Sequence, residues 1–67
     1  MSVAKHIEIT ADSTKSFEDA IQQGITTASR TVKGIRSAWV KDQQALVEQD
    51  KITTFRVNLK VTFVLES

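Results

Sequence analysis

The segment Phe55–Leu65, FRVNLKVTFVL, is the stretch from which the fold is predicted. Every odd-numbered position in it is apolar, and four of its five even-numbered positions are polar or charged. Because successive side chains of a β-strand point to opposite faces, this period of two predicts a strand with one buried face. The segment is also longer than the roughly 5–6 residues of a usual strand. A chain of 67 residues has little left to cover it, which indicates a partner, and the simplest partner is a second copy of the chain.

A first strand is predicted near the N-terminus, over Val3–Thr10, where apolar and polar residues also alternate. The next four residues, 11–14, are expected to form a turn that leads into a helix. Either Ser13 or Ser16 is expected to cap the helix, because a serine oxygen can accept hydrogen bonds from the free backbone N–H groups of the first turn.

The helix itself is predicted from an apolar stripe with three- and four-residue spacing. The stripe consists of Phe17, Ala20, Ile21, Gly24, Ile25, Ala28 and Val32. Arg30 and Lys33 are expected in the last turn, with Gly34 ending the helix in a left-handed conformation. Gly24 lies within the stripe and predicts a close approach between helix and sheet.

A second strand is predicted over Ile35–Val47, although its apolar residues fall on both parities. Such a strand is either buried on both faces or carries a bulge that exchanges its faces. The polar stretch Gln49–Lys51 then predicts a hairpin, so the last two strands should pair antiparallel. The expected fold class is α+β, with the order β-α-β-β and a three-stranded antiparallel sheet wrapped around one helix. The whole chain, 1–67, is expected to form a single domain.

Composition favours an oligomer and excludes several classes of protein. A core below roughly 70–80 residues rarely supplies more than about 3–5 kcal/mol without disulfides, metals or assembly. This chain has no cysteine to form disulfides, and its single histidine leaves no pair of residues for a metal site. Oligomerisation is therefore the remaining source of additional stability. A net charge of +1 does not indicate binding to nucleic acid or to an anionic membrane. With no signal peptide and no apolar run of transmembrane length, the expected location is the cytoplasm.

His6, Trp39 and Arg56 are the candidate catalytic or ligand-binding side chains of this sequence. His6 with Ser13 or Ser16 would be a poor catalytic set, because no third group and no fixed geometry is indicated, so an enzyme is not expected. Trp39, the only tryptophan, is either an interface plug or a stacking platform for a planar ligand. Arg56 is either a solvated charge or a planar cation that stacks on a ring or binds phosphate.

The order of elements, together with SFEDAI at the helix start, AWVKDQ in the second strand and the closing FRVNLKVTFVLE, resembles the dodecins. These are small flavin-binding proteins, and the resemblance covers essentially the whole chain. It implies twelve copies closed into a hollow shell, with flavins bound in pairs between tryptophans of neighbouring subunits. It also implies flavin storage or sequestration rather than catalysis, with riboflavin, FMN or FAD as the cofactor.

Position by position, the resemblance carries the flavin site onto Ser37, Trp39, Gln44 and Arg56. Ser37 stands at the family's stacking tryptophan, and Trp39 lies two residues further on, on the same side of a regular strand. Arg56 stands at the glutamine that hydrogen-bonds the flavin edge, and Gln44 at another ligand contact. The alternative is a dodecin-like shell in which Trp39 only packs the interface and flavin binds weakly or not at all. Such a shell would leave coenzyme A, calcium or another small ligand as candidates.

Overall fold

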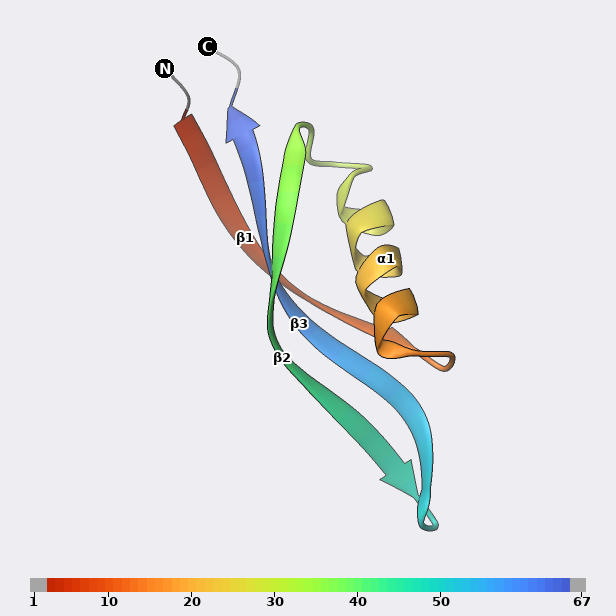
Figure 1. Cartoon of the computed structure of the whole chain (residues 1–67). Coiled ribbons are helices and arrows are strands. Elements are labelled where there is room, and N and C mark those ends of the chain that lie inside the picture. The colour runs from red at the N-terminus through yellow and green to blue at the C-terminus, as the bar shows by residue number, and fades with distance from the viewer. Residues whose placement is uncertain (1–2, 66–67) are drawn as a thin grey trace.

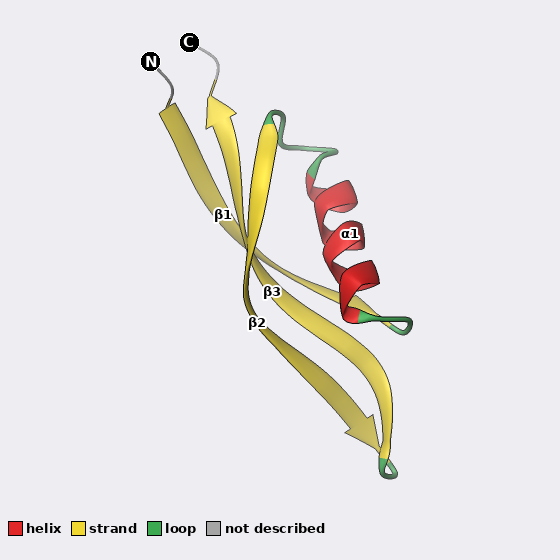
Figure 2. Cartoon of the chain, viewed as in Figure 1, coloured by secondary structure: helices red, strands yellow, loops and turns green. Residues whose placement is uncertain are grey.

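The computed structural model describes residues 3–65 and has the predicted order of elements (Figure 1). Strand β1 (Val3–Ser13) is followed by helix α1 (Phe17–Ala28), strand β2 (Ile35–Glu48) and strand β3 (Lys51–Leu65). The three strands form one antiparallel sheet in the order β1-β3-β2. The α+β prediction and the antiparallel pairing of the last two strands are confirmed (Figure 2).

Strand β3 lies at the centre of the sheet and supplies most of the fully buried core. Val57, Leu59 and Val61 are each 0% exposed and alternate with polar residues, as the period-two pattern predicts. Fully burying an aliphatic side chain of this size stabilises the fold by roughly 1.5–3 kcal/mol relative to leaving it exposed. The partly buried residues that pack on this core are Ile7, Ile9, Ala11, Phe17, Ile21, Ile25, Ile35, Ala38 and Val40.

Gly24 allows the helix to lie close to the sheet, as predicted. A Cβ atom at Gly24 would lie 3.1 Å from the Ala11 Cβ and 3.1 Å from the Leu59 Cδ1. Both neighbours belong to strands of the sheet, so a larger side chain here would push the helix away from its core. The close approach explains why a residue with low helix propensity occupies the middle of α1.

The start of α1 differs from the predicted turn. Ala11–Ser13 continues β1 instead of turning, and Ser13 pairs with Phe55 on β3. Ser16 is the N-cap, since its Oγ accepts a hydrogen bond of 2.9 Å from the Asp19 N–H. Ser13 is 5% exposed and donates a hydrogen bond of 2.6 Å from its Oγ to the Asp19 carboxylate. The predicted turn was wrong because pairing with β3 outweighs the local turn preference of these residues.

The end of α1 is also earlier than predicted. The helix ends at Ala28, and the N–H groups of Arg30 and Thr31 bond three residues back, which tightens the chain into a turn. Arg30 and Lys33 therefore lie outside the last helical turn, and Gly34 does not end the helix. Gly34 instead has φ of +79° in the link to β2, where a Cβ would lie 2.9 Å from the Val64 carbonyl oxygen.

Strand β2 is irregular, which explains its mixed parity. Its register against β3 shifts at three places: between Ile35 and Ser37, between Val40 and Asp42, and between Leu46 and Val47. Lys41 is the extra residue of the second shift, and each such bulge exchanges the face to which later residues point. The bulge alternative is therefore confirmed. Burial on both faces is not seen within one chain, since the Trp39 side of β2 is open.

The β2–β3 hairpin turns at Gln49 and Asp50, whose φ values are 50° and 66°. Two successive left-handed residues are typical of the hairpin turns that match the twist of the strands. The end of this hairpin extends past the helix, which covers only part of the sheet (Figure 1). Val47 and Ile52 near its tip are 58% and 57% exposed.

Candidate functional site

The face of the sheet that points away from α1 carries the polar residues. On β3 these are Arg56, Asn58, Lys60 and Thr62, which alternate with the buried core residues. Residues directly opposite each other in a sheet point to the same face. The register therefore adds His6, Glu8, Thr10 and Asp12 from β1 and Ser37, Trp39, Asp42 and Gln44 from β2. We call these residues, with Lys41 in its bulge, the outer face.

All four residues expected at the flavin site lie on the outer face, but in two groups. Ser37 and Trp39 are neighbours on one side of β2, opposite Thr62 and Lys60. Gln44 lies directly opposite Arg56. Lys60 and Arg56 are four positions apart on β3, a distance of roughly 13 Å along the strand. Within one chain, therefore, Trp39 and Arg56 are at different places on the outer face.

Trp39 is the most exposed large aromatic side chain of the described chain, at 73%. Together with Lys41 and Lys60 it lines a hollow of about 330 Å³. Lys41 is turned toward β1, where its Nζ lies 2.6 Å from the Glu8 Oε1. This hydrogen bond, with the positive charges of Lys41 and then Lys60, lowers the pKa of Glu8 below its usual value. The hollow thus combines an open aromatic surface with a mainly cationic rim.

Arg56 is held by its own subunit. Its Nε donates to Asp12 Oδ1 at 2.8 Å and its Nη2 donates to Asp12 Oδ2 at 3.0 Å, a two-point contact across β3 and β1. The hydrogen bond from Arg56 lowers the pKa of Asp12, and the same bond raises the pKa of Arg56. Asp12 could not be recognised as part of this site from the sequence, because only the pairing of β1 with β3 brings it to Arg56.

The middle of the outer face is fixed by a chain of hydrogen bonds. Thr10 donates to the Asn58 Oδ1 at 2.7 Å, and the Asn58 Nδ2 donates to the Asp42 Oδ1 at 2.5 Å. Further along, the His6 ring lies 2.9 Å from the Thr62 hydroxyl. Within residues 3–65 no three His, Cys, Asp or Glu side chains gather closely enough to hold a metal ion.

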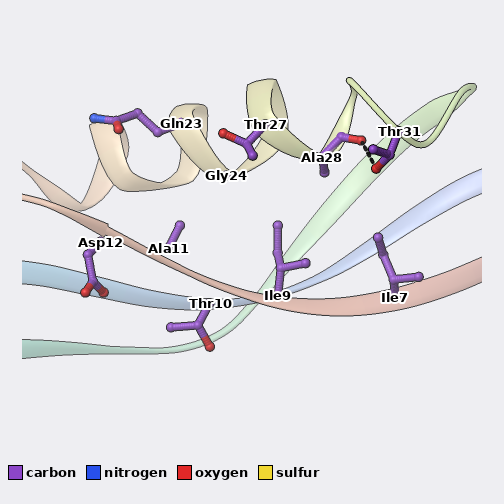
Figure 3. Close-up of a pocket in the computed structure, with 10 residues that line it drawn as sticks. All are labelled: Ile7, Ile9, Thr10, Ala11, Asp12, Gln23, Gly24, Thr27, Ala28 and Thr31. Atoms are coloured by element: carbon purple, nitrogen blue, oxygen red, sulfur yellow. Dashed lines mark hydrogen bonds between the residues drawn. The ribbon is translucent and has the colours of Figure 1, made fainter.

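The other side of the sheet has a larger hollow, of about 480 Å³, between α1 and β1 (Figure 3). Its floor is formed by Ile7, Ile9 and Ala11 of β1, and Gly24 and Thr27 of α1 form one wall. The lining combines these aliphatic residues with polar ones, among them Asp12, Gln23 and Thr31, and none of the four expected ligand residues belongs to it. A groove with an apolar floor beside the free edge of β1 suits packing against protein.

In residues 3–65, no helix has the length and apolar character needed to cross a membrane.

Comparison with known proteins identifies the family. The family model described as Dodecin matches residues 3–66. The calcium dodecin of Mycobacterium tuberculosis is 36% identical over 63 residues, which cover 94% of this chain and 89% of that protein. The similarity therefore extends through both groups of outer-face residues.

Solved dodecin structures have the same fold as this chain. A variant of the Thermus thermophilus dodecin superposes with a TM-score of 0.93 at 27% identity, covering 100% of this chain and 98% of that one. The crystal structure of the Mycobacterium tuberculosis calcium dodecin gives a TM-score of 0.83 at 34% identity, covering 97% and 93%. Family model, sequence relative and structures lead to one conclusion: the chain belongs to the dodecin family.

Proposed function

We propose that this protein is a flavin-binding homododecamer that stores or sequesters flavin by stacking it at subunit interfaces. The observation that carries the proposal is Trp39, a single tryptophan that is 73% exposed on the polar face of a dodecin fold. An indole left open among hydrogen-bonded polar groups offers a flat apolar surface on which a planar ring can stack. Stacking of a planar ring on an aromatic side chain contributes roughly 1–3 kcal/mol.

Assembly is supported by the apolar surface that one chain cannot cover. Val3, Trp39, Val47, Ile52 and Leu65 are all at least 45% exposed. Strands β1 and β2 are both edges of the sheet, and an open sheet edge is a site where further chains pair or pack. A closed shell of identical subunits would cover these edges and bring copies of Trp39 together across a symmetry axis.

A binding role is supported over a catalytic one by the positions of the candidate catalytic residues. His6 and Ser13 are seven residues apart on β1, roughly 23 Å along the strand. Ser16 caps α1 and Ser13 is engaged with Asp19, so both hydroxyls hold the helix start. These residues do not form a nucleophile–base pair within the chain.

The test is a titration of riboflavin and FMN with the protein, followed by the quenching of flavin fluorescence. Stacked flavin should be quenched, and Trp39→Ala should weaken affinity by about ten- to a hundred-fold. Trp39→Phe keeps a flat ring and serves as the matched control, with a smaller loss expected. The assembly state of each variant is measured alongside by size-exclusion chromatography. Wild-type protein that quenches neither flavin at tens of micromolar would exclude the proposal.

A second candidate is a dodecin-like shell in which Trp39 only packs against a neighbouring subunit. The same 73% exposure in the single chain supports it, because interface residues are open until the partner is present. It predicts that an assembled Trp39→Ala variant binds flavin as well as wild type does. One relative is named a calcium dodecin, so calcium is a candidate ligand of such a shell.

A further inference from the structure

The charged residues of the outer face are mostly paired with one another. Arg56 is bound to Asp12 through two hydrogen bonds, and Lys41 is bound to Glu8 at 2.6 Å. Asp42 accepts a hydrogen bond from Asn58. Lys60 lies between these groups on the central strand, and in the described part of the chain it takes part in neither ion pair. Its charge is therefore available to a ligand.

Lys60 also lies directly beside the exposed indole. It is the register partner of Trp39, and side chains directly opposite each other on adjacent strands have Cβ atoms about 4.5–5.5 Å apart. Both side chains line the hollow of about 330 Å³, with Lys41 as the third lining residue. Glu8 is bonded to Lys41 and lies opposite Lys60 in the sheet, so one negative charge faces two lysines and the three residues together keep a net positive charge beside the stacking surface.

Arg56 cannot provide the same contact from within one subunit. It lies roughly 13 Å along β3 from Lys60, and the carboxylate of Asp12 already occupies two of its donor groups. An anion bound at Arg56 would also meet the negative charge of Asp12. A ligand stacked on Trp39 with a negatively charged group would find its complementary charge at Lys60 instead.

We infer that Lys60 binds the anionic group of the ligand that stacks on Trp39, so that the site selects a phosphorylated aromatic ligand over its uncharged form. The inference rests on the proposed flavin function and names its ligand class: FMN, which carries a phosphate, over riboflavin, which does not. Lysine suits this role as a compact point charge on a flexible stem that can follow a phosphate.

The experiment compares the affinities for FMN and riboflavin in wild type and in Lys60→Gln. Wild type should bind FMN more tightly than riboflavin, and Lys60→Gln should weaken FMN binding by about ten-fold, as expected for losing a charged hydrogen bond. Riboflavin binding should change less than about two-fold, because the ring still stacks on Trp39. Lys60→Arg should keep the preference for FMN.

Lys51→Gln is the matched control, since it removes the same charge at the start of β3, far from Trp39 along the hairpin. It should leave both affinities unchanged. The preference for FMN should also shrink at raised salt, because mobile ions screen an exposed charge pair.

The outcomes separate the two proposals. If Lys60→Gln lowers both affinities equally, or neither, while wild type binds flavin, the flavin function stands and the role of Lys60 is wrong. If an assembled wild type binds neither flavin, the proposed function fails and the inference fails with it.

Discussion

Arg56 and Trp39 illustrate what single residues contribute to this site. Arg56 occupies a position expected to contact ligand, yet it donates two hydrogen bonds to Asp12 in its own subunit. Trp39 has no such engagement and presents 73% of its surface. The residues at the expected ligand positions are therefore not equivalent: one is held by its neighbour and one is open.

The pair of Arg56 and Asp12 predicts a pH dependence of stability. The pKa of Asp12 is lower in the folded chain than its ordinary 3.8, chiefly because of the hydrogen bond from Arg56. A carboxylate with a depressed folded-state pKa stabilises the fold above its unfolded pKa, and this contribution is lost as the pH falls through the folded value. The melting temperature of Asp12→Asn should therefore differ from wild type at pH 5–7, and the difference should shrink below about pH 3.8.

The measurement is a thermal unfolding series of wild type and Asp12→Asn from neutral to acidic pH. Because both side chains are more than a third exposed, the neutral-pH difference should be small and should decrease at raised salt. A difference that stays constant down to the lowest pH would show that the carboxylate charge is not what stabilises this pair.

The regular helix and strand segments of this chain could be predicted from its sequence, whereas the irregular segments could not. Strand β3 was recognised from its alternation, because a single buried face leaves a clear period of two. In β2 the bulge at Lys41 could be suspected but not located, since one extra residue has no compositional signature. The helix was predicted too long, because Val32 has helical spacing although the chain turns after Ala28.

The candidate site, too, could be predicted from the sequence only in part. Trp39 could be identified because tryptophan is rare and chemically distinctive. Asp12 and Lys60 could not be identified from the sequence. Asp12 lies beside Arg56 and Lys60 lies beside Trp39 only because of the register in which β1 and β2 pair with β3. That register is set by packing of the whole apolar face on the helix, which a single strand's pattern does not reveal.

The hydrogen bonds of Ser13 stabilise the junction of β1 and α1. Ser13 is almost fully buried, donates to Asp19 at 2.6 Å, and accepts a hydrogen bond of 2.9 Å from the Lys15 N–H. Ser13→Ala should lower the free energy of unfolding by about 1–3 kcal/mol, since it leaves a backbone donor without its partner. Urea denaturation measures this loss.

Ser29→Ala is the control for Ser13→Ala. Its hydroxyl donates to the Thr26 carbonyl in an exposed turn, and such surface changes usually alter stability by less than about 0.5 kcal/mol. Equal effects of the two substitutions would mean that the buried network at the start of α1 has no special role in stability.

The whole molecule is an extended sheet whose apolar surface is only partly covered by its single helix. Its principal extents are 51 × 19 × 13 Å, and its single 12-residue helix covers only part of one face (Figure 1). The hairpin end, the free edges of β1 and β2 and the groove beside α1 all present apolar surface to solvent. A chain with this shape is expected to depend on its copies for stability as well as for its ligand site.

We propose that copies of this chain close into a dodecamer and hold flavin at their contacts. Native mass spectrometry of the protein with added FMN tests both parts in one spectrum. One dominant species of twelve 7.5 kDa chains is expected, with further mass steps of bound FMN that are depleted in an assembled Trp39→Ala variant. A folded monomer at micromolar concentration would contradict the account, and so would a dodecamer to which no FMN adds.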